Sequence, residues 1–439
     1  GAGANIIPVL KWFFVPSLVL LCPLTSSKRR TLFNPPTLFY SIIGFFLCIT
    51  LLYGFVLYPN MESLTPSTEW ITRVIGDNHP HWVAIYKHWY HSLFFVVSEL
   101  WASVVIFLLF WGFANQITTV SEAKRTYTLM IAAGDIATLA TGWLITHFIT
   151  TYAFKGYSFT LQSLIALTTL LGLGMIFTYR WMQKHVIDDD HPTLKNRASR
   201  KTKLSLMASI KHIARSKHLF HIAILVIGCA LTINIIEVSF KALAKIEYPS
   251  QLDYQLFMGK LRTYVGFVAL ITVFFFSGGL LRLFGWRFSA QITPLALGIG
   301  GLIFLSLTLA KDHIAPFTAL IGMTPVTFLV GFGMCQFVLG KVVKYSFFDT
   351  TKEMAFIPLD QESKVKGKAA IDLVGSRFGK SGSSWLQIGL LDLVGTGSVL
   401  SITPFLLPVI ALMVFAWSRS VSAIGKELDE KESSTPAAA

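Results

Sequence analysis

The chain has 439 residues, of which 53% are hydrophobic and only 14% are charged, and its mean hydropathy is +0.61. A soluble domain usually contains about a quarter charged residues, so this composition excludes a protein whose whole surface faces water. The net charge of +14 would suit a nucleic-acid-binding protein, but the basic residues lie in short loops between long apolar runs, a pattern typical of membrane proteins.

Eleven apolar segments are predicted to cross a membrane as helices. A helix needs about 20 apolar residues to span the hydrocarbon core, and these segments are too long for barrel strands. They lie near Ile6–Leu24, Leu38–Leu57, Trp89–Phe113, Tyr127–Ile149, Leu161–Trp181, Leu219–Phe240, Thr263–Leu283, Ser289–Ala310, Pro316–Leu339, Lys368–Leu391 and Val399–Trp417. The predicted fold class is therefore an all-α polytopic membrane protein.

Two polar stretches interrupt this pattern. The first is a basic linker with no acid after Asp190, and it separates five predicted spans from six. The second, residues 345–368, is too polar to span and is predicted to form an interfacial helix followed by a turn at Pro358. We assign residues 1–182 to an N-terminal bundle, 183–218 to a cytoplasmic linker, 219–420 to a C-terminal bundle and 421–439 to a disordered tail.

The count of spans indicates that one N-terminal span is missing from this sequence. Transporters are commonly built from equivalent halves, whereas here five spans precede the linker and six follow it. Placing the linker in the cytoplasm puts most basic loops on that side, as the positive-inside rule requires. The C-terminal tail, with Arg419 and Lys426, then also lies in the cytoplasm.

Three acidic residues lie within the apolar segments. Glu99 occurs in VVSELWASVV, Asp135 in IAAGDIATLA, and Glu237 near the end of LTINIIEVSFK, close to Lys241. An ionisable side chain inside a membrane span is costly, so by default it indicates a functional site. Each acid could instead pair with a basic neighbour and fix helix packing, and the sequence leaves both interpretations open.

The most unusual predicted span is KAAIDLVGSRFGKSGSSWLQIGLL, which contains Lys368, Asp372, Arg377 and Lys380. Its glycines permit close approach of the backbone. Arg gives a forked contact to phosphate oxygens and Lys supplies a point charge, so this helix suits a cavity for a polyphosphate. The alternative is an amphipathic helix that faces the cytoplasm and never meets substrate.

Enzyme and metal chemistry are not predicted. The string GSRFGKS resembles a Walker A loop, but Val374 stands where that motif requires glycine, and no strand is predicted before it. The four cysteines lie in apolar runs without a CxxC pair, and the histidines between His79 and His91 lack the spacing of a zinc helix. We therefore expect no cofactor, no metal site and no ATP-hydrolysing pump.

Four stretches of the chain resemble the bacterial and plastid nucleotide transporters, known as the ATP/ADP translocases of obligate intracellular bacteria. They are SELWASVVIFLLFWGFANQITTVSEAKR (98–125), TYRWMQKHVIDD (178–189), NIIEVSFKALAKIEYPSQLDYQLFMG (234–259) and KYSFFDTTKEMAFIPLDQESKVKGKAAIDLVGSRFGKSG (344–382). The last stretch is long and specific, and the similarity extends over nearly the whole chain.

The resemblance implies a twelve-helix fold of two six-helix bundles, in the style of the major facilitator superfamily. It also implies that the missing span is the first one, which in the family ends in an Arg-Asp-x-Lys-Asp motif. The family residues that match Glu99, Glu237 and Lys380 are implicated in transport. Further cavity candidates are Lys241, Asn115, Lys368, Asp372 and Arg377. Asp135 stands where family members tend to have Asn.

The leading hypothesis is an ATP/ADP antiporter that imports host ATP in exchange for ADP by alternating access. Lys380, with Arg377, would neutralise phosphate charge, and Trp101 would stack on the base. Glu99 and Glu237 would hold these cations in the empty state. The alternative is a proton-coupled symporter for several nucleoside triphosphates, in which Asp135, Glu99 or Glu237 would carry the proton.

Two further hypotheses are a transporter of other organic phosphates and a membrane enzyme or receptor without transport. The expected partners are nucleotides (ATP, ADP and other nucleoside triphosphates), phosphate or protons, and the lipid bilayer, with no nucleic acid. We expect a monomer in the bacterial inner membrane.

Overall fold

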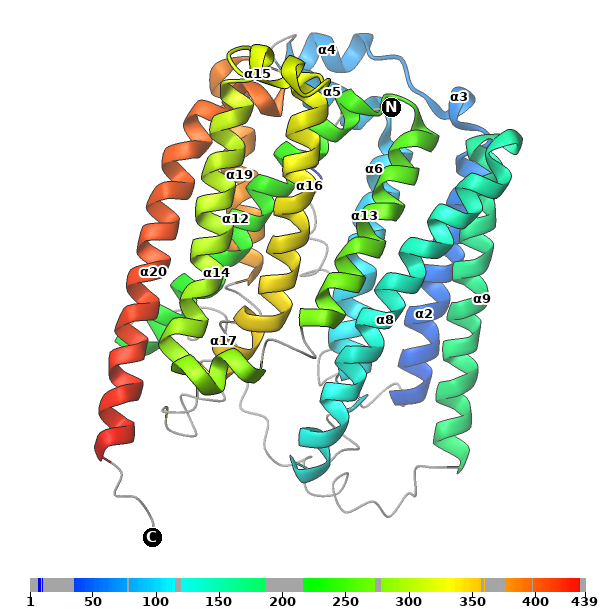
Figure 1. Cartoon of the computed structure of the whole chain (residues 1–439). Helices are drawn as coiled ribbons and strands as arrows, with labels where there is room; N and C mark the ends of the chain where they lie inside the picture. Colours follow the sequence, from blue (N-terminus) through cyan, green and yellow to red (C-terminus); the bar gives the residue numbers. More distant parts are fainter. Residues whose placement is uncertain are drawn as a thin grey trace. The chain divides into compact units, whose positions relative to one another are not determined.

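The computed structural model of the chain is helical, without strands, over the residues that it describes (Figure 1). These are residues 7–8, 10, 35–76, 79–111, 113–114, 120–185, 216–272, 278–356, 359, 371, 376–396 and 398–434. The chain divides into two compact units. The first comprises Gly1–Ala2, Val9–Gly134 and Leu144–Thr202, and the second comprises Gly3–Pro8, Asp135–Trp143 and Lys203–Ala439.

The first unit is built on long apolar helices joined by short ones. Its elements are α2 (Pro35–Leu52), η3 (Tyr53–Leu57), α3 (Met61–Leu64), α4 (Glu69–Ile75), α5 (Pro80–Lys87), α6 (Trp89–Trp101), η4 (Ala102–Phe110), most of α8 (Val120–Tyr152), η5 (Ala153–Lys155) and α9 (Gly156–His185). Helices α2 and α9 pack closely because Gly172 leaves room for Leu47. Two π segments, η3 and η4, continue α2 and α6.

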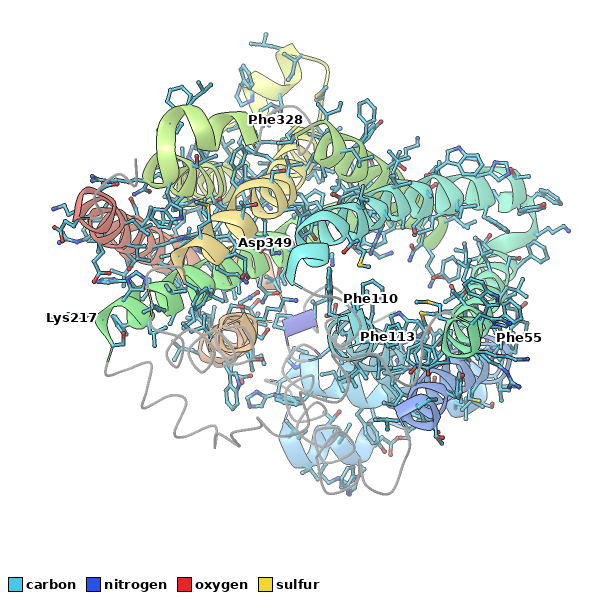
Figure 2. All side chains as sticks on the ribbon, turned by 90° about the horizontal axis from the view of Figure 1, so that it is seen from below. Phe55, Phe110, Phe113, Lys217, Phe328 and Asp349 are labelled. Carbon is cyan, nitrogen blue, oxygen red and sulfur yellow. The ribbon has the colours of Figure 1, made fainter. Side chains whose placement is uncertain are left out.

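Apolar side chains of the first unit lie on both the inside and the outside of its helices. Val97 and Val104 are buried in a cluster with Phe46, and Phe39 stacks on Tyr179 with ring centroids 3.8 Å apart. Phe55 on η3 is nevertheless 48% exposed (Figure 2). Large apolar side chains that point outward are expected of helices whose solvent is lipid.

The second unit surrounds one central helix, α12 (Lys217–Glu247), which packs against five other α-helices. Its elements after α12 are α13 (Gln251–Thr272), α14 (Gly278–Leu309), α15 (Ala315–Leu320), α16 (Pro325–Val343), η7 (Lys344–Phe348), α17 (Asp349–Ala355), α19 (Ser376–Val394), η9 (Val399–Ile402) and α20 (Thr403–Ser434). Two apolar clusters pack around α12, one including Trp417 and the other Phe240 and Phe304. A helix that is apolar on all sides is buried, and α12 fits this description.

Seven segments of the described residues are long and apolar enough to cross a membrane. They are Pro36–Leu57, Trp89–Ile106, Ala133–His185, Lys217–Glu247, Leu283–Leu309, Pro325–Ala355 and Val399–Glu430. The chain is therefore an all-helical polytopic membrane protein, as the composition predicted. Of the other predicted spans, Ile6–Leu24 lies almost wholly outside the described residues, and Thr263–Leu283 is interrupted by residues 273–277, which also lie outside them.

Two boundaries differ from the prediction. The span predicted from Pro316 begins only at Pro325, because α15 ends at a turn in which Gly322 adopts a φ of 71°. The tail predicted to be disordered from residue 421 is helical as far as Ser434. Val421 and Ile424 are fully buried against the second unit, so α20 continues as long as its apolar face has a partner.

Candidate substrate site

The candidate site lies in the second unit, where the predicted cationic helix α19 packs against α12. Gly379 makes this contact possible, because a Cβ there would lie 2.6 Å from Ala230 Cβ and 2.9 Å from the Ile227 carbonyl oxygen. Real side chains do not approach so closely. The glycine therefore brings the backbone of α19 against α12, as the glycine-rich sequence of this segment predicted.

Hydrogen bonds join the two helices one turn beyond Gly379. Asn234 on α12 donates through Nδ2 to Ser383 Oγ and Ser384 Oγ and, over 3.4 Å, to the carbonyl oxygen of Lys380. The same carbonyl accepts bonds of 2.8 Å and 3.0 Å from the two serines. Asn234 is buried, so this network fixes the turn that carries Lys380.

Glu237, one turn beyond Asn234 on α12, lies between two lysines. Its Oε1 lies 2.7 Å from Lys241 Nζ on the same helix, and its Oε2 lies 3.4 Å from Lys341 Nζ on α16. A cavity of about 10 Å³ adjoins the second pair and is also lined by Gln336. This volume suits about one water molecule, so the contact must open before a phosphate can enter.

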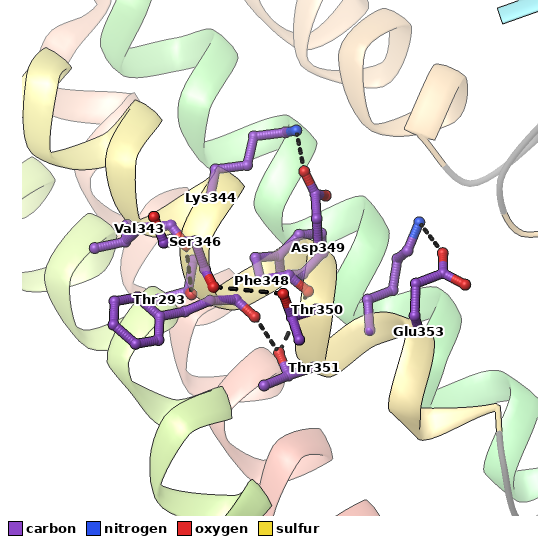
Figure 3. A network of polar contacts seen from close by, with 11 residues as sticks. Thr293, Val343, Lys344, Ser346, Phe348, Asp349, Thr350, Thr351 and Glu353 are labelled. Carbon is purple, nitrogen blue, oxygen red and sulfur yellow. Dashed lines mark hydrogen bonds and ion pairs between the residues drawn. The ribbon is translucent and has the colours of Figure 1, made fainter. Parts of the chain in front are cut away.

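Lys344 forms a further ion pair just beyond Lys341. Its Nζ lies 3.1 Å from Asp349 Oδ2, and the two side chains point toward one another (Figure 3). Residues five apart would lie about 140° apart around an α-helix, but here the π turn η7 joins them. The Asp349 N–H donates to the Lys344 carbonyl oxygen, which is the bond that defines a π turn. Such turns are frequent at functional sites.

Helix α17, which follows this turn, is held by two neighbouring helices, α12 and α14. It lies beside α12 (Figure 2). Trp286 Nε1 on α14 donates to the Thr351 carbonyl oxygen over 2.9 Å, and His218 Nε2 on α12 donates to the Ala355 carbonyl oxygen over 2.7 Å. The other ring nitrogen of His218 contacts Glu427 on α20. The predicted helix over residues 345–368 thus exists as far as Ala355, while Pro358 lies outside the described residues.

A cavity of about 660 Å³ in the second unit does not suit a phosphate. It is apolar and lies between α13, α14 and α16. The described residues that line it are Tyr264, Val268, Thr272, Ile292, Met334, Cys335, Val338, Leu339, Val342, Val343 and Phe347. None of them carries a charge, so the chemistry of an anion points to the lysines around Glu237 instead.

Comparison with known proteins identifies the family of the chain. The family model "TLC ATP/ADP transporter" matches residues 1–428. The chain belongs to this family. One relative, ADP,ATP carrier protein 1 of Chlamydia pneumoniae, is 36% identical over 439 residues, covering 97% of this chain and 85% of the relative.

Other relatives of this transporter family come from rickettsiae and plastids. ADP,ATP carrier protein 1 of Rickettsia bellii is 34% identical over 434 residues, covering 97% of this chain and 86% of the relative. The chloroplastic ADP,ATP carrier protein 1 of Arabidopsis thaliana is 35% identical over 425 residues, covering 95% of this chain and 67% of the relative. The predicted resemblance is thereby confirmed, and the chain is a transporter family member rather than an enzyme.

The structure brings together only some of the residues that the sequence singled out in this transporter. Asn234, Glu237, Lys241 and the Lys380 turn meet at one junction of the second unit. Lys241 and Lys341, not Lys380, are the described lysines that pair with Glu237. The Lys380 residue is exposed. Lys368, Asp372 and Asn115 lie outside the described residues, as does the side chain of Arg377.

The predicted residues outside this junction have different surroundings. Glu99 on α6 is half-buried. Trp101, at the end of the same helix, is partly buried and packs edge-on to Phe46 with ring centroids 5.5 Å apart. On α8, Asp135 is half-buried, and its buried Oδ2 has no hydrogen-bond partner among the described residues.

Sequence reasoning missed Lys341 and Lys344 as site residues. Both follow the last apolar residue of a predicted span, so hydropathy assigned them to a loop. The structure keeps them in helix, because α16 continues through Val343 into η7. One signal was available: Lys341 and Lys344 are three residues apart, which is the spacing of neighbours on one helix face.

Proposed function

We propose that this protein is a nucleotide transporter that exchanges ATP for ADP. The observation that carries the proposal is Glu237 between two lysines of different helices, next to the turn of Lys380, inside a bundle of membrane-spanning length. Ionisable groups at such depth indicate a substrate path. Family membership and relatives named ADP,ATP carrier proteins support the nucleotide as substrate.

We further propose a fold of two helical bundles, as in transporters built from equivalent halves. The two bundles would rock about a central site to expose it alternately on each side of the membrane. Residues 183–218 would form the linker between them, on the cytoplasmic side with the C-terminus. A location in a bacterial inner membrane is consistent with the chlamydial and rickettsial relatives.

In this mechanism Lys380 and Arg377 neutralise the phosphates, with Lys368 and Asp372 on the same segment and Asn115 as further cavity candidates. Glu237 and Glu99 keep the lysines of the site charged and oriented while it is empty. Strict exchange requires that the empty carrier does not reorient. Lysines without phosphate supply this barrier, because their charges would have to cross the membrane interior without a compensating anion.

The test is uptake of labelled ATP by liposomes that contain the purified protein and are preloaded with ADP. Lys380→Ala is expected to reduce exchange sharply. Lys245→Ala is the matched control, because Lys245 lies on α12 one turn beyond Lys241 but makes its hydrogen bond at an exposed position, to the Pro249 carbonyl oxygen. Exchange that survives in Lys380→Ala, with protein of equal yield and thermal stability, would remove Lys380 from the mechanism.

A second candidate function is proton-coupled import of several nucleoside triphosphates. The buried, unpartnered Oδ2 of Asp135 favours it, because a protonated carboxyl is the less costly form in such surroundings. Glu99 and Glu237 are alternative proton carriers. A protonophore separates the two functions, since it abolishes proton symport in energised vesicles and leaves ATP/ADP exchange unchanged.

A further inference from the structure

Lys341 and Lys344 lie together at the junction of α16 and η7. Residues three apart on a helix are neighbours, so both side chains leave the same face. Neither is a freely solvated surface lysine, because their side chains are 22% and 32% exposed and each lies against a carboxylate. Each ammonium group lies within 3.4 Å of a carboxylate oxygen, so each lysine on this face already takes part in a contact with an anionic group.

The ion pair of Lys341 can be exchanged at little cost. Glu237 holds Lys341 at 3.4 Å but Lys241 at 2.7 Å, so the carboxylate has a closer partner on its own helix. Loss of the only partner would leave a costly unpaired charge inside the protein. Here Glu237 keeps Lys241 when Lys341 moves to another anion, and that penalty does not arise.

The ion pair of Lys344 can be exchanged for a different reason. Its partner Asp349 is 42% exposed, so a released carboxylate is hydrated rather than stranded. Both lysines also lie against aromatic rings, with Lys341 Nζ 5.1 Å from the centre of the Phe337 ring and Lys344 Nζ 4.6 Å from that of Tyr345. These cation–π contacts hold the ammonium groups in place while their anionic partners change.

We propose that Lys341 and Lys344 form a phosphate-binding pair that takes a phosphate group of the substrate in exchange for the carboxylates of Glu237 and Asp349. The inference rests on the proposed nucleotide transport and adds a second cationic element to Lys380. Phosphate competes well for both lysines, because its oxygens accept charge-assisted bonds from several donors at once.

Binding at this pair also acts on α17. The Lys344–Asp349 ion pair closes the same π turn as the backbone bond between these residues (Figure 3). When phosphate takes Lys344, the first residue of α17 loses its side-chain tie to η7. The contacts of α17 with Trp286 and His218 then hold the helix, together with the bonds of Thr350 and Thr351 to carbonyl oxygens of η7. Phosphate binding thereby loosens the junction of α16 and α17.

The test measures binding of inorganic tripolyphosphate and of ATP to the purified full chain by isothermal titration calorimetry. Lys341→Gln and Lys344→Gln are each expected to weaken tripolyphosphate binding by about tenfold or more, as for the loss of one bond to a charged group. Asp349→Asn is expected to tighten binding, because it removes the competitor for Lys344. A purely structural Lys344 would not produce this gain. Lys245→Gln is the control and is expected to bind as the wild type does.

Several outcomes would overturn the inference. The inference is wrong if tripolyphosphate does not bind to the wild type, or if it binds to both lysine variants as tightly as to the wild type. This holds even where ATP exchange and its dependence on Lys380 persist. A lipid headgroup phosphate is the other source of this chemistry. If the pair binds lipid instead, the lysine variants will retain less phosphatidylglycerol, as measured by native mass spectrometry, while their tripolyphosphate binding stays unchanged. Failure of the proposed function is separate, because it appears as absent ATP exchange in the wild type.

Discussion

Gly379 sets how closely α19 approaches α12, and Gly379→Ala tests this packing directly. The added Cβ would lie 2.6 Å from Ala230 Cβ and 2.9 Å from the carbonyl oxygen of Ile227. Carbon atoms in contact lie about 3.5–4.0 Å apart, so α19 has to withdraw by about 1 Å. Overpacking of this kind costs about 1–3 kcal/mol.

Withdrawal of α19 also strains the hydrogen bonds that Asn234 makes to it. Loss of one such bond costs about 1 kcal/mol, so the total reaches about 2–4 kcal/mol. At a few degrees per kcal/mol, the Tm of the purified protein in detergent falls by about 5–10 °C. The same displacement moves the Lys380 turn, so ATP exchange is expected to fall as well.

Gly382→Ala is the matched control on the same helix. A Cβ at Gly382 meets no atom within 4 Å, and alanine favours helix over glycine by about 1 kcal/mol. This variant is therefore expected to keep or raise the Tm, as followed by intrinsic fluorescence during heating. Equal Tm values for Gly379→Ala and Gly382→Ala would refute the close approach of the two helices.

Three further predictions concern single contacts. Asn234→Leu leaves the serines of α19 without their partner on α12 and is expected to lower the free energy of unfolding by about 1–3 kcal/mol. The measurement is the Tm, and an unchanged Tm would contradict the hydrogen-bond network. Trp286→Phe removes the donor to Thr351 and is expected to speed proteolysis near α17 at a cost of about 1 kcal/mol, and an unaltered digestion pattern would argue against this anchor. Burial lowers the pKa of His88, which lies just before α6, so the folded protein favours the neutral imidazole. The stability that this neutral form contributes is present above the ordinary His pKa of about 6.5 and is lost as the pH falls below it. The Tm should therefore drop between pH 7 and pH 5, and His88→Phe should reduce that drop.

The energetic cost of an ionisable side chain inside a membrane span identified part of the candidate site. Glu237 was singled out because a carboxylate in an apolar segment is energetically costly without a partner, and the structure shows it between two lysines. The glycines of α19 likewise predicted a close approach, which Gly379 makes. Both inferences use local sequence only, since they depend on what one residue type does in one helix.

Contacts between distant segments were beyond the reach of such reasoning. Lys341 was assigned to a loop because hydropathy averages over a window, whereas its place depends on Glu237 of another helix. No sequence pattern predicted the π turn that pairs Lys344 with Asp349. The packing of Trp101 on Phe46 likewise depends on how α2 meets α6.

The helical C-terminal segment restricts where the protein can be cut or labelled. Val421 and Ile424 are fully buried, and burial of such side chains contributes about 1.5–3 kcal/mol each. Glu427, one turn further on, reaches His218 and through it α17. A purification tag or fluorescent protein that replaces residues from 421 onward would therefore unseat α17, whereas one attached after Ser434 leaves these contacts intact.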